Sequence, residues 1–268
     1  MDGLQTWVIN LDRAPERMAG IGARLQALGL PYTRLPAVDA RALTPEQHAA
    51  LDEAAYCRQH GMTPLLGELG CYLSHIEVMR AFLASKGQFA LVLEDDVGLS
   101  PALPAVLQGL MQHPAHWDVV KLSAVHRGTP QPVLALPEGH QLAVMLSRVT
   151  GSSAYLMNRR AAEAWLGLRD PAVSLLPMQL PYDHAYDRAW RFGLKQRLVV
   201  PQPCLHDADA PSTIGATSAN NGQRKFPWFK RLSTYRYRLG NEVRRLVYGL
   251  SETRSAKSGK HLGIPSPR

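Results

Sequence analysis

The first 35 residues contain two apolar segments separated by a helical one, and this order restricts the fold more than any other feature of the sequence. Residues 6–11, Thr-Trp-Val-Ile-Asn-Leu, are mostly β-forming and predict a buried strand. Pro15 stands in the first turn of a predicted helix that runs to residue 28 and ends at Gly29. Residues 32–35 predict a second strand. A strand–helix–strand unit of this kind predicts an α/β fold with a mostly parallel sheet, which binds ligands at the carboxyl ends of its strands.

The same alternation of strands and helices continues to residue 200, and 268 residues suffice for one large α/β domain with a real core. Further helices are predicted over residues 44–59, 67–85 and 159–168. Further strands are predicted over residues 89–93, 117–122, 153–157 and 198–200. We therefore expect residues 1–221 to form a single domain.

The positive charge of the chain is concentrated after residue 221. The sequence has 30 Lys and Arg and 22 Asp and Glu, but 12 of the basic residues and only two of the acids lie within 222–268. Within 222–250, apolar residues recur mostly every three or four positions among arginines, which predicts a basic amphipathic helix. Residues 251–268 have few apolar side chains and are expected to form a flexible tail.

Two roles are open for this basic segment. It would bind a polyanion such as an anionic membrane surface, or it would pack on the body with its arginines in water. Nucleic acid is not an expected partner, because the segment has no recognised nucleic-acid motif and the near-neutral body offers no extended basic groove.

The number and spacing of the cysteines and the absence of long apolar runs indicate the cellular compartment in which the protein works. Cys57, Cys71 and Cys204 are odd in number and far apart, which argues against a disulfide scaffold or a structural zinc site. No apolar run approaches the roughly 18 residues of a membrane-spanning helix. The opening residues lack the basic flank and apolar stretch of a secretory signal, so we expect a cytoplasmic protein.

Three adjacent carboxylates, Glu94, Asp95 and Asp96, directly follow the predicted strand 89–93. Carboxylates at the end of a buried strand are costly unless a cation or hydrogen-bond donors compensate them. Mg²⁺ and Mn²⁺ bind through a few carboxylate oxygens and take other ligands from water and phosphate. The triplet therefore favours a cation and phosphate site over the alternative, a solvated turn.

Other polar residues are candidates with two interpretations each. Asp183 would act as a general base or cap a helix N-terminus. His206 would be a late metal ligand or a surface residue. Arg17, one helical turn after Arg13, would reach a phosphate or remain a solvated helix charge. His75 lies on an apolar helix and is expected to pack in the core.

Segments spread over residues 5–215 form a recognisable series. The most specific is Gly-Glu-Leu-Gly-Cys-Tyr-Leu-Ser-His at 67–75, followed by the acidic triplet at 94–96. The others are 8–13 with Arg17, 37–40, 91–96, 151–157, 181–183 and 211–214. Together they resemble the family 25 glycosyltransferases, which include lipooligosaccharide and lipopolysaccharide glycosyltransferases and collagen galactosyltransferase relatives.

The resemblance implies a GT-A-like fold, a Rossmann-type α/β sandwich that binds a nucleotide sugar at its strand ends and a metal through a DxD-type acidic motif. Carried over by position, Glu94, Asp95 and Asp96 become that motif. Asp96 is then the expected metal ligand, while Glu94 and Asp95 belong to the nucleotide-sugar site.

The resemblance also implies roles outside the triplet. Asn10 and Arg17 follow the first strand and Asp39 the second, where such folds hold the base and ribose of the donor. His206 becomes a second metal ligand, because GT-A enzymes often draw a late ligand from this region.

The expected reaction is the inverting transfer of a hexose from a nucleotide sugar, expected to be a UDP-sugar, to a hydroxyl of a lipopolysaccharide or lipooligosaccharide core. Mn²⁺ or Mg²⁺ is the expected cofactor and Asp183 the expected base. The acceptor is lipid-linked, so the basic C-terminal segment is expected to hold the enzyme at the inner face of the cytoplasmic membrane. The alternatives are a metal-dependent nucleotidyltransferase or phosphohydrolase and a non-catalytic polyanion-binding protein.

Overall fold

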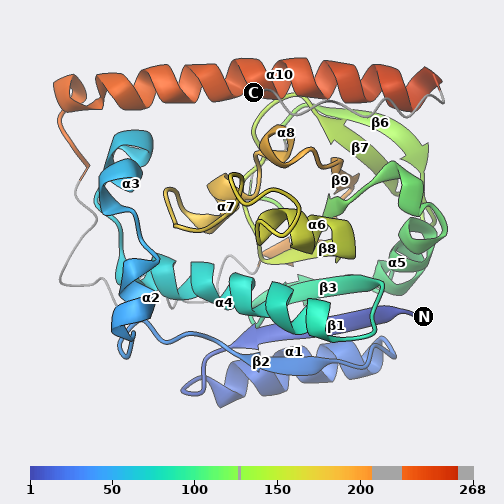
Figure 1. Cartoon of the computed structure of the whole chain (residues 1–268). Coiled ribbons are helices and arrows are strands. Elements are labelled where there is room, and N and C mark those ends of the chain that lie inside the picture. Colours follow the sequence, from blue (N-terminus) through green and yellow to red (C-terminus); the bar gives the residue numbers. More distant parts are fainter. Residues whose placement is uncertain (126–127, 207–224, 259–268) are drawn as a thin grey trace.

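The structure is a computed structural model that describes residues 1–125, 128–206 and 225–258. Its larger sheet contains β1 (Leu4–Asn10), β2 (Thr33–Pro36), β3 (Phe89–Glu94), β5 (Val119–Lys121), β6 (Pro130–Ala135), β7 (Gln141–Met145), β8 (Ala154–Asn158) and β9 (Gln196–Val200). Within the described residues these eight strands lie in the order β2-β1-β3-β8-β5-β9-β7-β6 (Figure 1). A separate antiparallel pair joins β4 (Val97–Leu99) to β10 (Cys204–His206).

Helices cover both faces of the sheet. They are α1 (Pro15–Ala27), α2 (Pro45–Ala49), α3 (Glu53–His60), α4 (Leu66–Ala84), α5 (Leu103–Gln112), α6 (Arg159–Trp165), α7 (Tyr182–Ala185), α8 (Ala189–Phe192) and α10 (Leu232–Ser258). Short 3₁₀ turns span Pro114–His116 and Trp228–Arg231. In β3, Val92 packs in the core with α4 and α6, whereas Leu91 packs in the core with α1 and α5. The strand is buried on both faces, which explains its continuous apolar run.

The sheet is mixed in its pairing, although most of its strands share one direction. β1 is parallel to β2 and β3, and β5 is parallel to β9. The reversed strand β8 lies between β3 and β5, and β7 pairs antiparallel with both β6 and β9. The expectation of a mostly parallel sheet therefore holds for strand direction but not for pairing. The physical reason is that the β6–β7 hairpin, rather than a crossover helix, separates β5 from β8.

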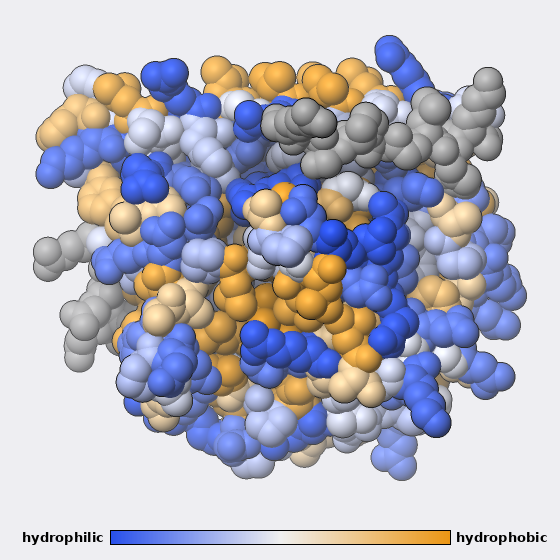
Figure 2. Space-filling view, viewed as in Figure 1, coloured by the Kyte–Doolittle hydropathy of each residue, from blue (hydrophilic) through white to orange (hydrophobic). Residues whose placement is uncertain are grey.

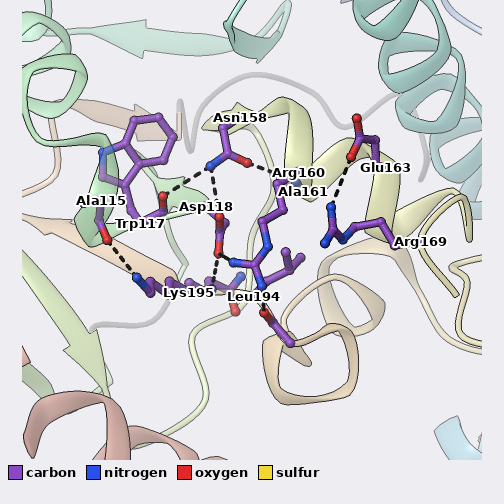
Figure 3. Close-up of polar contacts among 12 residues, drawn as sticks. Ala115, Trp117, Asp118, Asn158, Arg160, Ala161, Glu163, Arg169, Leu194 and Lys195 are labelled. Atoms are coloured by element: carbon purple, nitrogen blue, oxygen red, sulfur yellow. Dashed lines mark hydrogen bonds and ion pairs between the residues drawn. The ribbon is translucent and has the colours of Figure 1, made fainter. Parts of the chain in front are cut away.

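A buried carboxylate fixes the reversed strand beside its neighbours. Asp118, directly before β5, has a side chain only 6% exposed. It accepts hydrogen bonds from Asn158 Nδ2 at the end of β8 (3.0 Å), from Arg160 Nη1 in α6 (2.9 Å) and from the backbone N–H of Lys195 before β9 (2.8 Å), as Figure 3 shows. One acid thus ties β5, β8 and β9 together at the same edge.

The helix predicted over 44–59 is two helices, α2 and α3. Between them, Leu51 forms a parallel bridge with Met178, and the Asp52 side chain accepts a hydrogen bond from the Ala55 N–H to begin α3. Because the bridge joins residues far apart in the sequence, the local helical pattern does not indicate it.

The C-terminal segment is one long helix on the outside of the molecule. α10 lies along one edge of the fold in Figure 1. It continues to Ser258, beyond the predicted boundary at residue 250, and residues 259–268 lie outside the described part. Among the helices that the structure describes, none combines the length and hydrophobicity needed to cross a bilayer.

Candidate active site

The acidic triplet lies where two parallel strands end side by side. Glu94 is the last residue of β3, and the β1–β3 register pairs it with Ile9, so Asn10 at the end of β1 is adjacent. The Asn10 Nδ2 atom donates a hydrogen bond of 2.6 Å to Asp95 Oδ2. Asn10, which the resemblance places in the nucleotide-sugar site, therefore contacts the acidic triplet.

Arg17 joins the same cluster from α1. Its Nη2 atom lies 2.6 Å from Asp95 Oδ1 and 2.6 Å from Asp96 Oδ2. All three side chains are mostly buried, with 17%, 10% and 12% of their surface exposed. The interpretation of Arg17 as a solvated helix charge is thus wrong, because the side chain lies between two carboxylates.

Burial and charge act in opposite directions on Asp95. Removal from water raises the pKa of its carboxyl, and the Asn10 hydrogen bond and the Arg17 charge oppose that rise. The net direction is upward. The two neighbouring acids also raise it, so this cluster has a surplus of negative charge that an added cation would relieve.

Glu94 points to a different set of partners, within α4 and the β8 side of the sheet. Its Oε1 atom lies 3.4 Å from His75 Nε2 and 3.3 Å from Ser152 Oγ, which donates to it. The buried imidazole of His75 stacks on Tyr182 with a centroid separation of 3.9 Å, and its Nδ1 lies 3.0 Å from the Tyr155 hydroxyl. His75 is therefore a core residue, as predicted, but also a polar partner of the triplet.

Asp183 is connected to Glu94 through the backbone of residues 151 and 152. Its Oδ2 atom accepts a hydrogen bond of 3.3 Å from the backbone N–H of Gly151, the residue before Ser152. Gly151 has φ of +104°, a conformation that favours glycine. Asp183 does not cap a helix, since the N-cap of α7 is Pro181. The structure thus connects Asp183 to the triplet through two consecutive residues.

Asp39 is held by a separate pair of arginines. Its carboxylate bonds with Arg13 and with Arg41, whose Nη2 lies 2.9 Å away. The hydrogen bonds from Arg41 and Arg13 hold the pKa of Asp39 well below its usual range. The loop that carries Asp39 packs tightly on α4, where a Cβ at Gly70 would lie 2.7 Å from the Val38 carbonyl oxygen.

The structure places part of the remaining predicted site. His206 is the last residue of β10 and pairs in register with Val97, which directly follows Asp96. Its side chain and residues 211–214 lie outside the described part of the structure.

Two sets of side chains have the chemistry of a metal site. Asp95 Oδ1 and Asp96 Oδ2 converge on the Arg17 guanidinium, and carboxylate oxygens are also the donors that suit Mg²⁺ or Mn²⁺. Cys71, His75 and Glu94 offer sulfur, nitrogen and oxygen atoms within 4.8 Å of one another, a set that suits zinc. Burial and nearby carboxylates raise the pKa of the Cys71 thiol, which opposes the thiolate that zinc binding requires. The oxygen set is therefore the better cation site.

The sequence pattern misses several polar residues of this site. Ser152, Tyr155 and His75 all contact one another or Glu94, yet none was assigned a site role. The available signal was the segment 67–75, the most specific in the chain, which contains both Cys71 and His75.

Comparisons with known proteins agree with this geometry. The family model described as glycosyltransferase family 25 (LPS biosynthesis protein) matches residues 4–185, which include the triplet and Asp183. A glycosyltransferase 25 family member of Aedes aegypti is 33% identical over 99 residues, covering 35% of this chain and 16% of its own length. Procollagen galactosyltransferase 1 of Danio rerio is 27% identical over 182 residues, covering 65% of this chain and 30% of its own length. Procollagen galactosyltransferase 2 of Homo sapiens is 26% identical over 182 residues, covering 65% and 29%.

This chain thus spans less than a third of the length of these curated relatives. The family match itself covers more than half of the chain, and it confirms the resemblance of the motifs. By that match the chain belongs to glycosyltransferase family 25.

Proposed function

We propose that this chain transfers a hexose from a nucleotide sugar to a hydroxyl of a lipopolysaccharide or lipooligosaccharide core. The observation that carries the proposal is the cluster of Asp95 and Asp96 around the Arg17 guanidinium at a strand end, in a chain of family 25. In a Rossmann-like α/β sheet such a strand end is where a nucleotide ligand binds. We further propose that this α/β fold is of the GT-A type.

The descriptions of the family and of its relatives support our choice of donor and acceptor. Galactosyltransferase relatives support a hexose donor, for which a UDP-sugar is our choice. The family description as an LPS biosynthesis protein supports the acceptor. Because that acceptor is anchored in a bilayer, we place the enzyme at the inner face of the cytoplasmic membrane, peripherally attached through its basic C-terminal segment.

Asp95 and Asp96 would hold a divalent cation, Mn²⁺ or Mg²⁺, with His206 as the expected further ligand. Carboxylate oxygens are the donors that such an ion prefers, and the ion would take the position that the Arg17 guanidinium occupies between them. The bound ion supplies a Lewis acid for the charge that develops on the departing diphosphate.

The chain's own side chains would orient the donor and move one proton. The Arg17 guanidinium has N–H donors suited to a diphosphate oxygen, and Asn10 holds Asp95 in place. Glu94 would contact the ribose, and Asp39 would lie near the base. Asp183 would take the proton from the acceptor hydroxyl as that oxygen attacks the anomeric carbon in line, which inverts the configuration.

A thermal-shift panel tests donor and cation together. We expect UDP-galactose or UDP-glucose to raise the melting temperature more with Mn²⁺ than without it, because ligands that bind only the native state stabilise it by mass action. GDP-mannose and a CMP-sugar should give smaller shifts. Asp96→Asn should lose the part of the rise in melting temperature that depends on Mn²⁺. Asp170→Asn, which changes an exposed acid away from the site, should retain it. The proposal is wrong if no sugar nucleotide shifts the wild-type melting temperature.

A further inference from the structure

The long helix α10 contacts the body through its polar face. Arg245 Nη1 lies 2.6 Å from Asp187 Oδ2, and Arg197 Nη2 lies 2.6 Å from Glu252 Oε2. All four of these side chains are at most 7% exposed. Nearer the start of the helix, the Thr234 hydroxyl donates to the Arg58 carbonyl oxygen at 2.8 Å. The docked face thus combines hydrogen bonds and ion pairs with the aromatic rings of Tyr237 and Tyr248, which pack on the core.

The opposite face of α10 is apolar and faces outward. From Trp228 to Leu250, nine large apolar side chains are between 41% and 69% exposed. At 3.6 residues per turn, Leu232, Leu239, Val243 and Leu250 form one row, directly opposite the docked residues. Figure 2 shows apolar side chains along the edge of the molecule that α10 forms in Figure 1. We call this row and its apolar neighbours the outer face.

This arrangement reverses the usual amphipathic order. A helix on the surface of a water-soluble domain normally turns its apolar stripe toward the core. A contiguous apolar surface left in solvent marks a site of association with a protein or a membrane. No residue that the structure describes covers the outer face, so we expect this surface to bind another molecule.

The charges around the outer face identify that occupant. Between residues 225 and 258, the exposed charged side chains are six basic ones and a single acid, Glu242. The basic ones are Lys225, Lys230, Arg236, Arg244, Arg254 and Lys257. A second copy docked on the same face would bring two positive sets together, which like-charge repulsion opposes. An anionic bilayer accepts the apolar row and attracts the basic side chains at once.

We propose that α10 is an in-plane membrane anchor whose outer face inserts into the interfacial region of an anionic bilayer while its polar face stays docked on the body. The inference rests on the membrane attachment proposed above and assigns it to particular residues. A helix of 27 residues is roughly 40 Å long at 1.5 Å per residue, which is long enough to span a bilayer. It is not apolar enough to cross, and one face is occupied by ion pairs to the body, so it would lie along the surface. Because the docked face contains buried ion pairs, the anchor would hold the whole fold in one orientation.

Vesicle sedimentation tests the anchor. Full-length protein is mixed with phosphatidylcholine vesicles containing 30% phosphatidylglycerol, and with vesicles of phosphatidylcholine alone. We expect Leu239→Gln and Leu239→Glu to lower the partition coefficient on anionic vesicles, the Glu variant at least tenfold. Leu168→Glu is the matched control, because Leu168 is 67% exposed and Leu239 68%, and it should bind like the wild type. High salt should weaken wild-type binding without abolishing it, since insertion of the apolar row is not screened.

Other outcomes would overturn the anchor. They are absence of wild-type binding to anionic vesicles, equal binding by Leu239→Glu, or a dimer in analytical ultracentrifugation that Leu239→Glu converts to a monomer. The donor-induced thermal shift is measured on the same variants. If the wild type shows the donor-induced shift but does not bind anionic vesicles, the anchor is wrong and the proposed sugar transfer is unaffected.

Discussion

Asp183 is the proposed general base, and its substitution would separate an effect on the chemical step from an effect on donor binding. It bonds to the Gly151 N–H but does not belong to the Arg17 cluster. We expect Asp183→Asn to lower kcat about 10²–10⁴-fold, the usual effect of losing a general base. The asparagine oxygen can keep the Gly151 hydrogen bond, so donor binding should be retained. Steady-state kinetics combined with donor-induced thermal shifts measure both effects.

Asp170→Asn is the control for that experiment, because Asp170 is an exposed acid outside the site. Wild-type turnover by Asp183→Asn would place the base elsewhere. A loss of donor binding equal to the loss of kcat would make Asp183 a structural residue.

At this scale, the sequence predicts polar residues at or soon after a strand end, including Arg17 in the first turn of α1, and misses His75 on α4. Asn10 and Asp95 are predictable because each comes at or just after the end of an apolar run, and parallel strand ends meet. His75 is not, because four-residue spacing on an apolar helix is the same for a core side chain and for one that contacts Glu94. Only the register of α4 against the sheet decides between them.

The junction of α3, α7 and α10 contains two partly buried histidines. His60 and His184 have ring centroids 5.4 Å apart, and Arg238 of α10 donates to the His60 carbonyl oxygen at 2.8 Å. Burial lowers the pKa of His60 to about 4. The charges of His184, Arg238 and Arg148 lower this pKa further, and the charge of Asp183 opposes the shift. Burial also lowers the pKa of His184.

These shifts predict an acid-sensitive junction. In the unfolded chain a histidine binds its proton below about pH 6.5, whereas folded His60 stays neutral down to about 4. Between these values the unfolded state binds more protons, so the free energy of unfolding falls as the pH drops from about 6.5 to about 4. Urea unfolding at pH 7.5, 6, 5 and 4 measures this slope. His60→Gln should make it shallower, and His48→Gln, at an exposed position, should leave it unchanged; equal slopes in all three proteins would contradict the assignment.

At the scale of elements, local pattern predicts α1, α4, β1 and β3 closely, because each is long or strongly apolar. It misses α5 and the β6–β7 hairpin, and it does not indicate that β8 is reversed. Strand direction depends on which connection lies between strands, and the hairpin at 130–145 has a half-exposed pattern with two prolines in β6. Long-range pairing, not propensity, decides these elements.

Across the whole molecule, a chain of buried polar contacts links the outer helix to the site. Arg245 of α10 pairs with Asp187, and Asp187 Oδ1 lies 3.1 Å from the buried Lys121 Nζ. Lys121 in turn donates to the Val149 carbonyl oxygen, two residues before the Gly151 that holds Asp183. The position of α10 and the position of the proposed base are therefore fixed by one continuous network.

Arg245→Met tests whether this network supports the fold. Removing one partner of a buried ion pair leaves the other charge poorly compensated, which typically costs about 3–5 kcal/mol. Lys121 still pairs with Asp187, so we expect the lower end, about 3 kcal/mol in the free energy of unfolding by urea. Arg244→Met, at the exposed neighbouring position, should change it by no more than about 0.5 kcal/mol. Equal losses in the two variants would mean that α10 is held on the body by its general packing and not by the Arg245–Asp187 ion pair.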